Sequence, residues 1–471
     1  MNLAEKLASF PPPRRIPGAR RALREALIQS HSKLVVVDDD PTGTQTVHGV
    51  RVFMEWSVPT LRAALARPEP LFYVSTNSRS MPRAEAEALA HELGRNLRAA
   101  AEHTGVQVVV ASRSDSTLRG HFPAEVDALS SELPAPVDGV ILVPAFFDAG
   151  RYTIDNIHWV EAAGVLVPAH ETEFARDPDF GFAHGDLREW IHEKTAGAVE
   201  AGSVICISLE QIRRGGPDRI AATLQEARGG IPIVANAACD EDLEVLALGV
   251  LSAEQSGKRF IYRTSASFVK VRGGVDDRAL LTRLEVRPGP GPGLVVAGSY
   301  VARTTAQIDR LVAAGRATPV EISVPLLLSE STHMREVRRA TRAASDAMAR
   351  GTTVLMYTTR AKQDTVDFLS AGRNVMAGLC EAVAGIPQRP GFLVAKGGIT
   401  SIALVRSALG CTEAEVLGQI HKGVPVWRLG AGSRWNDVPY IVFPGNVGDS
   451  TSLLTIVETL TGEPSIGSES V

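Results

Sequence analysis

The sequence predicts an α/β protein of two domains, each a mainly parallel sheet flanked by helices. Short apolar runs alternate along the chain with helix-length stretches rich in Ala, Leu, Glu and Arg, which is the pattern of βαβ units. The length of 471 residues accommodates two or three domains, at about 150 residues each. A Pro-Gly-Pro-Gly-Pro-Gly segment at 288–293 marks the boundary between them, because helices and interior strands tolerate that composition badly.

Each expected element follows from its residue pattern. Buried strands are expected where apolar and β-branched residues run together, at 33–37, 71–75, 106–111, 139–143, 203–208, 231–235, 259–262, 294–297, 353–357, 392–395 and 440–443. Helical patterns cover 83–104, 240–255, 302–314 and 331–350. The chain should therefore contain an N-terminal helical extension (1–32), a first α/β domain (33–287), the linker (288–293), a second α/β domain (294–462) and a flexible tail (463–471).

The composition argues against several classes of protein. A net charge of −4 gives no polyanion-binding signal, so nucleic acid is not an expected partner. The four cysteines lie far apart without a CxxC pair, which excludes an obvious zinc site or disulfide framework and fits a reducing cytosol. No apolar run approaches the roughly 18 residues of a membrane span, and no signal-peptide pattern is visible. We expect a soluble cytoplasmic protein without a membrane partner.

The most informative stretch is 34–43, LVVVDDDPTG, where a buried strand runs into three carboxylates and a turn. Open α/β sheets bind ligands at the carboxyl ends of their strands, so this position favours a ligand site. A solvated turn explains an isolated acidic triplet equally well. The recurrence of polar residues after other strands favours the site.

Polar and charged residues also follow the next three expected strands. One sheet would gather these strand ends along a single edge and form a pocket for a small hydroxylated anion. Arginines can fork onto a substrate carboxylate, while Asp and Ser/Thr side chains hold its hydroxyls. For each arginine alone, a surface salt bridge is the alternative. The arginines are Arg79, Arg113, Arg119 and Arg151.

The second half carries three strand–glycine–helix junctions with hydroxyl residues, at 298–299, 397–401 and 445–451. Glycine lets the backbone approach a ligand closely, and helix N-termini present N–H groups to phosphate, so the three junctions predict a nucleotide cradle. No P-loop or dinucleotide fingerprint is present, and the absence of the latter argues against a nicotinamide-linked dehydrogenase. Lys396, just before the glycine pair, is interpreted either as a phosphate partner or as a turn lysine.

These motifs resemble those of the four-carbon acid sugar kinases, from about residue 33 to residue 460. In the first half the matching motifs are D-D-x-T-G (39–43), D-S-T-L-R-G (115–120), P-A-F-x-x-x-G-R (144–151) and T-x-F-A-x-D-P (172–178). In the second half they are G-S (298–299), G-G-x-T-S (397–401) and G-N-x-G-D (445–449). The D-S-T-L-R-G match is the most specific of them.

The resemblance implies an ATP-dependent kinase that phosphorylates a hydroxyl of threonate, erythronate, 3-oxo-tetronate or a related acid in a cleft between the domains. Asp39 or Asp40 would accept the hydroxyl proton. The residues that would bind the sugar acid are Thr42, Gly43, Asn77, Arg79, Arg113, Asp115, Ser116, Arg119 and Arg151. Those that would bind ATP are Ser299, Lys396, Gly397, Gly398, Ile399, Thr400, Gly445, Asn446 and Gly448. Mg²⁺ would bridge the phosphates, and the sequence does not assign its protein ligands. A homodimer is a candidate assembly.

The sequence also departs from the family pattern in three places. Pro41 stands where many members have a bulky apolar residue, and Ile399 replaces an acidic residue in the glycine-pair turn. The segment 181–197 is also unlike that of the commonest members. These departures bear on the substrate more than on the fold, and they leave open a non-catalytic sensor that binds a sugar acid and a nucleotide.

Overall fold

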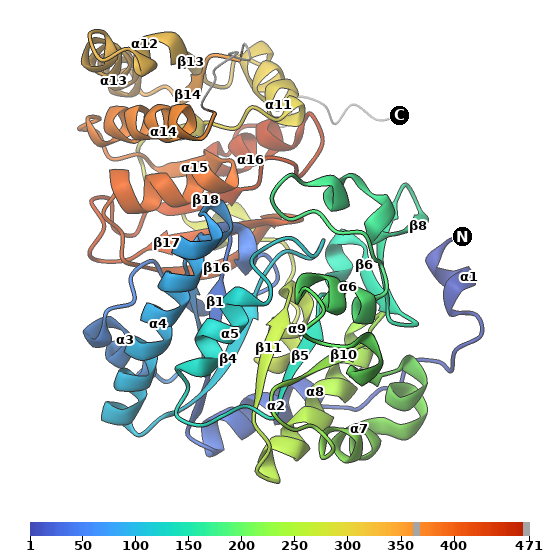
Figure 1. The fold of residues 1–471 in the computed structure, drawn as a ribbon. Helices are drawn as coiled ribbons and strands as arrows, with labels where there is room; N and C mark the ends of the chain where they lie inside the picture. Colours follow the sequence, from blue (N-terminus) through green and yellow to red (C-terminus); the bar gives the residue numbers. More distant parts are fainter. Residues whose placement is uncertain (361–367, 465–471) are drawn as a thin grey trace. The chain divides into compact units, whose positions relative to one another are not determined.

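The computed structural model describes residues 1–360 and 368–464, which fold as two compact units (Figure 1). The first unit is Met1–Asp277 and the second is Arg278–Val471. The predicted linker at 288–293 lies within the second unit, where the Gly289 N–H donates to Gly391 O and Gly293 begins a strand. Most of the predicted tail, 465–471, lies outside the described residues.

The first unit is built on a sheet of parallel strands. Four apolar residues in a row, Leu34–Val37, and burial of every position in β1 show why: a strand covered on both faces needs no polar side. The spatial order is β2 (Val50–Phe53), β3 (Leu71–Ser75), β1 (Ser32–Asp38), β4 (Gln107–Arg113), β11 (Phe260–Thr264), β5 (Gly139–Val143), β10 (Ile231–Ala235) and β9 (Ile205–Ile207).

Helices cover this sheet. The longest, α4, buries Ala86, Ala90, Leu93 and Leu97 at helical spacing, and the last three join Val35 of β1 in one apolar core. The helices of this unit are α1 (Leu3–Leu7), α2 (Ala19–Gln29), α3 (Val58–Leu65), α4 (Arg83–Thr104), α5 (Ala124–Ser131), α6 (Leu187–Lys194), α7 (Gly216–Leu224), α8 (Asp240–Gln255) and α9 (Ala266–Arg272). A small antiparallel sheet of β6 (Arg151–Ile154), β7 (Ile157–Ala162) and β8 (Val165–Pro168) completes it.

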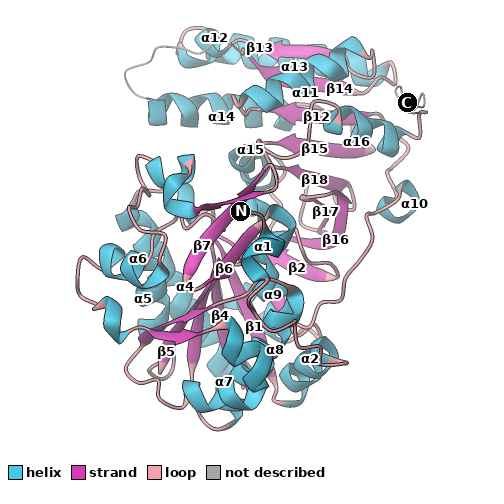
Figure 2. Ribbon diagram, turned by 90° about the vertical axis from the view of Figure 1, so that its right-hand side faces the viewer, coloured by secondary structure: helices cyan, strands magenta, loops and turns pink. Residues whose placement is uncertain are grey.

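The second unit repeats this design on a mainly parallel sheet, drawn in magenta in Figure 2. The order is β13 (Thr318–Ile322), β14 (Val354–Thr358), β12 (Gly293–Ala297), β15 (Phe392–Lys396) and β18 (Pro439–Phe443), followed by the antiparallel β17 (Val424–Leu429) and β16 (Glu413–His421). The helices are α10 (Arg283–Val286), α11 (Ala302–Ala313), α12 (Val324–Leu328), α13 (His333–Ala349), α14 (Phe368–Ala384), α15 (Gly398–Ala403) and α16 (Ser452–Thr461).

Both units share one strand order, which creates a place for a ligand. The first strand, β1 or β12, lies between the third strand of its unit, β3 or β14, and the fourth, β4 or β15. Chain connections therefore leave in opposite directions on either side of the first strand. Such switch points at the carboxyl ends of strands are where open α/β sheets bind their ligands.

The predicted α/β class and its mainly parallel strands are confirmed. The predicted helices at 83–104 and 240–255 coincide with α4 and α8. Four strands of the main sheets, β2, β13, β16 and β17, were not expected. Among the described residues, no helix combines the length and the apolar character needed to cross a membrane.

Candidate functional site

The register of the first sheet brings the predicted acidic and basic residues together. Asp38, the last residue of β1, pairs with Ser75 at the end of β3 and with Arg113 at the end of β4. Thr264 at the end of β11 also pairs with Arg113. The segments that leave these strands therefore start side by side at the switch point.

Arg79 is the centre of this cluster and contacts three carboxylates. Its Nε lies 3.1 Å from Asp39 Oδ2, and its Nη2 donates to Asp39 Oδ1. Its Nη1 lies 3.3 Å from Asp40 Oδ2 and 3.8 Å from Asp115 Oδ1. Burial disfavours the guanidinium charge, but the three carboxylates outweigh it and raise the pKa of Arg79 well above its ordinary value. Arg79 therefore holds three separate carboxylates in one fixed arrangement.

The two candidate bases differ in how fully their oxygens are occupied. Both oxygens of Asp39 accept hydrogen bonds, from Arg79 and from the Ser114 hydroxyl, and its side chain is 4% exposed. Asp40 Oδ1 accepts the Thr42 N–H at 2.7 Å and the Thr42 hydroxyl at 2.6 Å, whereas its Oδ2 contacts only Arg79 among the described residues. The Asp40 side chain is 25% exposed. Burial acts to raise the pKa of Asp40, but Arg79 and Thr42 outweigh burial and lower it. This carboxylate is therefore ionised at neutral pH.

Asp38 has a different environment from its two neighbours. It is fully buried, its Oδ1 lies 3.4 Å from Arg113 Nη1, and its Oδ2 has no hydrogen-bond partner among the described residues. Burial raises the pKa of Asp38 to about 8. A Cβ at Gly43 would lie 1.9 Å from Asp38 Oδ2, so Gly43 covers this carboxyl and leaves no room for a side chain.

The Asp115–Gly120 turn supplies the next part of the cluster. Asp115 Oδ2 accepts from Arg119 Nε at 2.8 Å and from the Thr117 hydroxyl. Burial opposes ionisation, but Arg79 and Arg119 hold the pKa of Asp115 far below its usual range. Arg119 also lies 3.6 Å from Asp177, within the predicted T-x-F-A-x-D-P stretch.

Arg151 is the exception among the four predicted arginines. Arg79, Arg113 and Arg119 each pair with a carboxylate. Within the described residues Arg151 has no carboxylate partner: it donates to Ala149 O, and its buried Nε has no hydrogen-bond partner. Its guanidinium lies 5.8 Å from the centre of the Phe174 ring, and Arg119 lies 5.2 Å from the same ring. Arg151 thus has donors to spare for an anion.

The sequence did not reveal a second layer beneath the cluster, made of Glu125, Arg263 and Ser114. Arg263 Nη1 lies 3.8 Å from Glu125 Oε2 and 3.3 Å from Ser112 Oγ. A Cβ at Gly120, whose φ is +118°, would lie 2.6 Å from Ser114 Oγ and 2.8 Å from Arg263 Nη2. Burial raises the pKa of Glu125 and lowers that of Arg263. The sequence signal for Arg263 was its place directly after the 259–262 apolar run.

Three other predicted residues lie along the same edge with local roles. Thr42 donates to Asp40, as described above. The Asn77 side chain donates to Ser80 Oγ at 2.7 Å, and its backbone has φ +60°. The Ser116 carbonyl lies 2.7 Å from His158 Nε2, and burial lowers the pKa of this histidine to about 4.

In the second unit, the three glycine turns pack against one another. The strands before them are in register, with Ala297 beside Lys396 and Lys396 beside Phe443. A Cβ at Gly298 would lie 2.7 Å from Thr400 Oγ1, one at Gly397 would lie 3.1 Å from Ser299 Cβ, and one at Gly445 would lie 2.9 Å from Ser299 Oγ. Ser299 therefore lies where the three turns meet, and the glycines are needed for that approach.

Side chains of α11 hold the third turn in place. The Thr304 hydroxyl lies 3.1 Å from Gly445 O and 3.4 Å from Ser299 Oγ. Arg303 Nη1 donates to Asn446 O at 2.5 Å, and Gln307 Nε2 donates to Val447 O at 3.1 Å. Gly448 has φ +79°, a conformation that favours glycine. A cradle of closely packed glycines and hydroxyls fits phosphate groups, which need short approaches to the backbone.

Two predicted residues of the second unit lie differently from the rest. Lys396 is fully buried; its Nζ donates to Pro444 O at 2.7 Å and lies 3.5 Å from the centre of the Phe443 ring. Burial lowers the pKa of Lys396 to about 6. This geometry favours the turn-lysine interpretation. Ile399 is 58% exposed, beside Gly398 at the start of α15.

A cation site formed by the protein alone is not evident. Among residues 1–360 and 368–464, no group of three or more His, Cys, Asp or Glu side chains is arranged to hold a metal ion. Asp449 Oδ1 is occupied by the Thr451 hydroxyl and the Ser452 hydroxyl.

Comparisons with known proteins agree with this division. Residues 34–272 match a family model described as a sugar-binding N-terminal domain, and residues 294–453 match one described as a nucleotide-binding C-terminal domain. A D-threonate kinase of Salmonella typhimurium is 25% identical over 448 residues, which are 89% of this chain and 96% of that protein. A D-erythronate kinase of Heliobacterium modesticaldum is 24% identical over 456 residues, 91% of this chain and 97% of that protein.

A solved structure supports the fold. The crystal structure of a Haemophilus influenzae protein superposes with a TM-score of 0.62 at 18% identity, covering 91% of this chain and 99% of the other. At that identity the likeness concerns the fold alone. The two family models together cover most of the chain.

Proposed function

This chain belongs to the four-carbon acid sugar kinase family, and we propose that it phosphorylates a hydroxyl of a four-carbon sugar acid with ATP. The observation that carries the proposal is the arginine-bound carboxylate cluster at the switch point of the sugar-binding unit. Phosphoryl transfer requires mainly positioning, charge neutralisation and a carboxylate to accept the hydroxyl proton. The cluster offers groups for each of these tasks on the acceptor side.

Arg151 is our candidate for the carboxylate of the sugar acid. Arg79 and Arg119 already neutralise carboxylates of the protein, and Arg113 lies 3.4 Å from the buried Asp38 carboxyl, so a substrate anion would have to compete with these groups. Among the described residues, the only hydrogen-bond partner of the Arg151 side chain is a backbone oxygen. A charge-assisted hydrogen bond from a guanidinium to a carboxylate is strong and directional. Arg119 and Phe174 would fix the orientation of Arg151 through the shared ring contact.

Asp40 is our candidate for the base, and Asp39 for a positioning residue. Asp40 is ionised, partly exposed, and has one oxygen with a single long contact to Arg79. Asp39 has both oxygens occupied and is almost fully buried. A general base must come within hydrogen-bond distance of the proton that it accepts, which favours the more exposed carboxylate.

The second unit would bind ATP through the three glycine turns. Ser299, Gly397 to Thr400 and Gly445 to Gly448 would contact the phosphates, with Thr304 supporting Ser299 and Gly445. Mg²⁺ bound with the nucleotide would neutralise charge on the phosphates. Because the γ-phosphate must reach the acceptor hydroxyl, the proposal requires the two units to bring their ligands together during turnover.

The test is a turnover assay with a matched set of acceptors. The full chain is incubated with Mg-ATP and with each stereoisomer of the four-carbon aldonic acids and 3-oxo acids, and ADP release is followed. We expect turnover on at least one acid and none on the corresponding four-carbon polyol, which lacks the carboxylate for Arg151. An absence of turnover on every acid, together with thermal shifts caused by acid and nucleotide, would instead support the sensor.

A further inference from the structure

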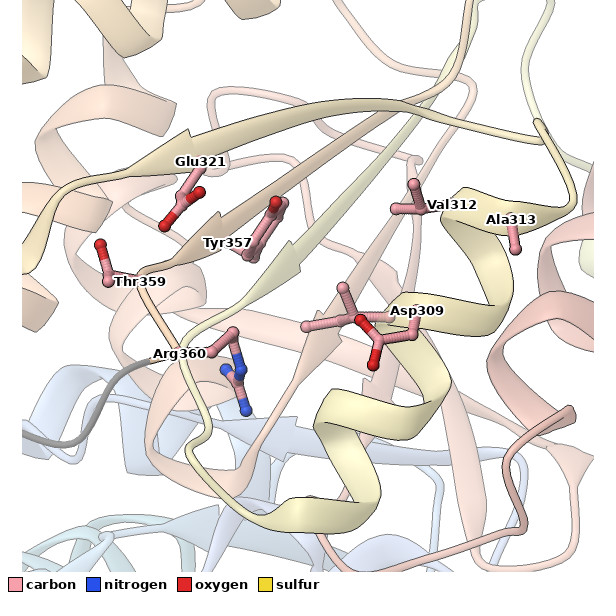
Figure 3. Close-up of a pocket in the computed structure, with 8 residues that line it drawn as sticks. Asp309, Val312, Ala313, Glu321, Tyr357, Thr359 and Arg360 are labelled. Carbon is pink, nitrogen blue, oxygen red and sulfur yellow. The ribbon is translucent and has the colours of Figure 1, made fainter.

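A pocket of about 540 Å³ lies in the second unit, apart from the glycine turns (Figure 3). One wall is the helix α11, and the other is formed by β13, β14 and the residues that follow β14. Its volume is in the range of small-molecule sites, which extends from about 300 to 1,000 Å³.

The side chains that line this pocket combine an apolar wall, an aromatic ring and two carboxylates. Ile308 and Val312 present the apolar wall from α11. In Figure 3, Tyr357 of β14 stands on the opposite side of the pocket from Val312. Asp309 and Glu321 add a carboxylate from either side. Among the described residues neither carboxylate group forms a hydrogen bond or ion pair that would satisfy it. A planar base between apolar side chains, with a diol facing a carboxylate, matches this chemistry.

The register of the sheet connects this pocket to the phosphate cradle. Tyr357 pairs with Glu321 on one side and with Ala297 on the other, and Ala297 leads directly into Gly298 and Ser299. Partners in register point to the same face of the sheet. The pocket is therefore one strand away from the start of the first glycine turn.

The helix α11 makes the same connection along its axis. Thr305, Ile308, Asp309 and Val312 share one face, because residues three and four apart are neighbours on a helix. Arg360 donates to Thr305 Oγ1 at 3.1 and 2.8 Å, and its Nη1 has no hydrogen-bond partner among the described residues. From Thr305 to Val312 the helix rises about 10 Å, which is comparable to the length of a nucleoside.

We propose that this pocket holds the nucleoside of the bound nucleotide, with the base between Tyr357 and the Ile308–Val312 wall and the ribose diol facing Asp309 and Glu321. The inference rests on the proposed function for the position of the phosphates. Arg360 would lie between the nucleoside and the phosphates, where its unpartnered Nη1 would donate to the ribose or the α-phosphate. A ligand with an anionic end and an aromatic, hydroxylated end would use both the glycine turns and the pocket.

The test separates the two regions with two probes, ADP and inorganic tripolyphosphate, titrated calorimetrically into the full chain. Tyr357→Ala removes the aromatic ring from the pocket, and Val312→Trp fills the pocket. Each should weaken ADP binding about tenfold, the scale of one base–aromatic stack. Tripolyphosphate binding should stay unchanged in both, which also shows that the variants fold. Met334→Trp, at a 50% exposed apolar position on α13, is the control and should bind both as the wild type does.

Two results would overturn the inference in distinguishable ways. Wild-type affinity for ADP in both pocket variants would place the nucleoside elsewhere while leaving the kinase proposal intact. A wild-type protein that binds neither ADP nor tripolyphosphate would overturn the kinase proposal and the pocket with it. The diol contact has its own readout: the double variant Asp309→Asn, Glu321→Gln should lose the preference for ADP over 2′,3′-dideoxy-ADP. If the preference persists, the carboxylates do not hold the ribose.

Discussion

The switch point of the first unit and that of the second share an arrangement of strands but differ in what holds them together. In the first, charged side chains dominate, with Arg79 between Asp39, Asp40 and Asp115. In the second, glycine backbones and hydroxyls pack around Ser299, and the one lysine faces the interior. Ion pairs between side chains organise the strand ends of the first unit, and close contacts of glycine backbones with side chains organise those of the second.

This difference follows from the chemistry of the proposed ligands. A small sugar acid offers a carboxylate and hydroxyls, which side chains with directional hydrogen bonds distinguish best. A triphosphate is large and uniformly anionic, and backbone N–H groups can line it if no side chain intervenes. The same topology can therefore serve two ligands when only the residues after the strands change. Substitutions that alter charge should affect the first edge, and substitutions that add volume should affect the second.

The largest expected effect comes from removing the candidate base. Asp40→Asn should lower kcat by about 100- to 10,000-fold, the usual contribution of a general base, with ADP affinity unchanged. Asp39→Asn should instead raise KM for the acid and lower stability, because it leaves Arg79 with fewer buried partners. Steady-state ADP release and denaturation curves measure both. Full activity of Asp40→Asn beside an inactive, stable Asp39→Asn would reverse the two assignments.

Arg79→Met tests whether charge holds the first edge. Loss of the guanidinium leaves the buried Asp39 carboxylate uncompensated, and we expect a loss of about 3 to 5 kcal/mol in the free energy of unfolding. Because the pKa of Asp40 is lowered in the fold, the stability it contributes is present above about pH 4 and is lost as the pH falls. The difference in the free energy of unfolding between the variant and the wild type should therefore become smaller at acid pH. Urea denaturation at several pH values measures it.

Arg21→Met provides the matched control, since Arg21 pairs with Glu25 on an exposed helix surface with 73% of its side chain exposed. Its effect should stay below about 0.5 kcal/mol. Equal losses in the two variants would contradict the view that the arginine cluster is the stabilising element of this edge.

Asp38→Asn sharpens the distinction within the acidic triplet. The pKa of Asp38 is raised to about 8 in the fold and lies near 4 in the unfolded chain, so the folded state binds the extra proton between these values. Stability contributed by this group therefore falls as the pH rises through that window, by up to about 1.4 kcal/mol per pH unit. The variant should lack this slope and gain stability relative to wild type from pH 5 to pH 8. Parallel curves for the two proteins would show that Asp38 does not titrate in this range.

The smallest expected effect concerns the second edge. Gly445→Ala places a methyl group 2.9 Å from Ser299 Oγ and should raise KM for ATP about tenfold, equivalent to about 1.4 kcal/mol, with little change in KM for the acid. Gly432→Ala is the control, because the nearest atom to its Cβ is 3.5 Å away. Both are measured by varying ATP at saturating acid. An effect on acid binding instead would contradict the division of labour between the two edges.

The fold was predictable where the local pattern is decisive. The strands Leu71–Ser75 and Gly139–Val143 lie as expected because a fully apolar run has few alternatives. The hairpin of β16 and β17 was not expected, because its first strand alternates buried and half-buried residues and contains polar ones. A Lys-Gly turn at 422–423 was the available signal.

The candidate site was predictable only for residues that directly follow a strand in a recognisable motif. Asp39, Arg79 and Asp115 lie together because their strands are neighbours, as a parallel sheet requires. Arg263 and Glu125 were not found, since their contact joins residues far apart in sequence, from β11 and α5. The pocket beside Tyr357 was not found either, because its walls come from three elements that the sequence alone does not place together.

The triple contact of Arg79 also bears on how a protein of this design can change its substrate. Since one side chain joins the segments after β1, β3 and β4, an altered residue in any of them would disturb the other two. New specificity is easier to acquire outside that junction, at Phe174, whose ring centre lies 5.2 Å from the Arg119 guanidinium, and at Arg151, which lies 5.8 Å from the same ring. A library limited to those two positions should yield altered acceptor preference with folding intact.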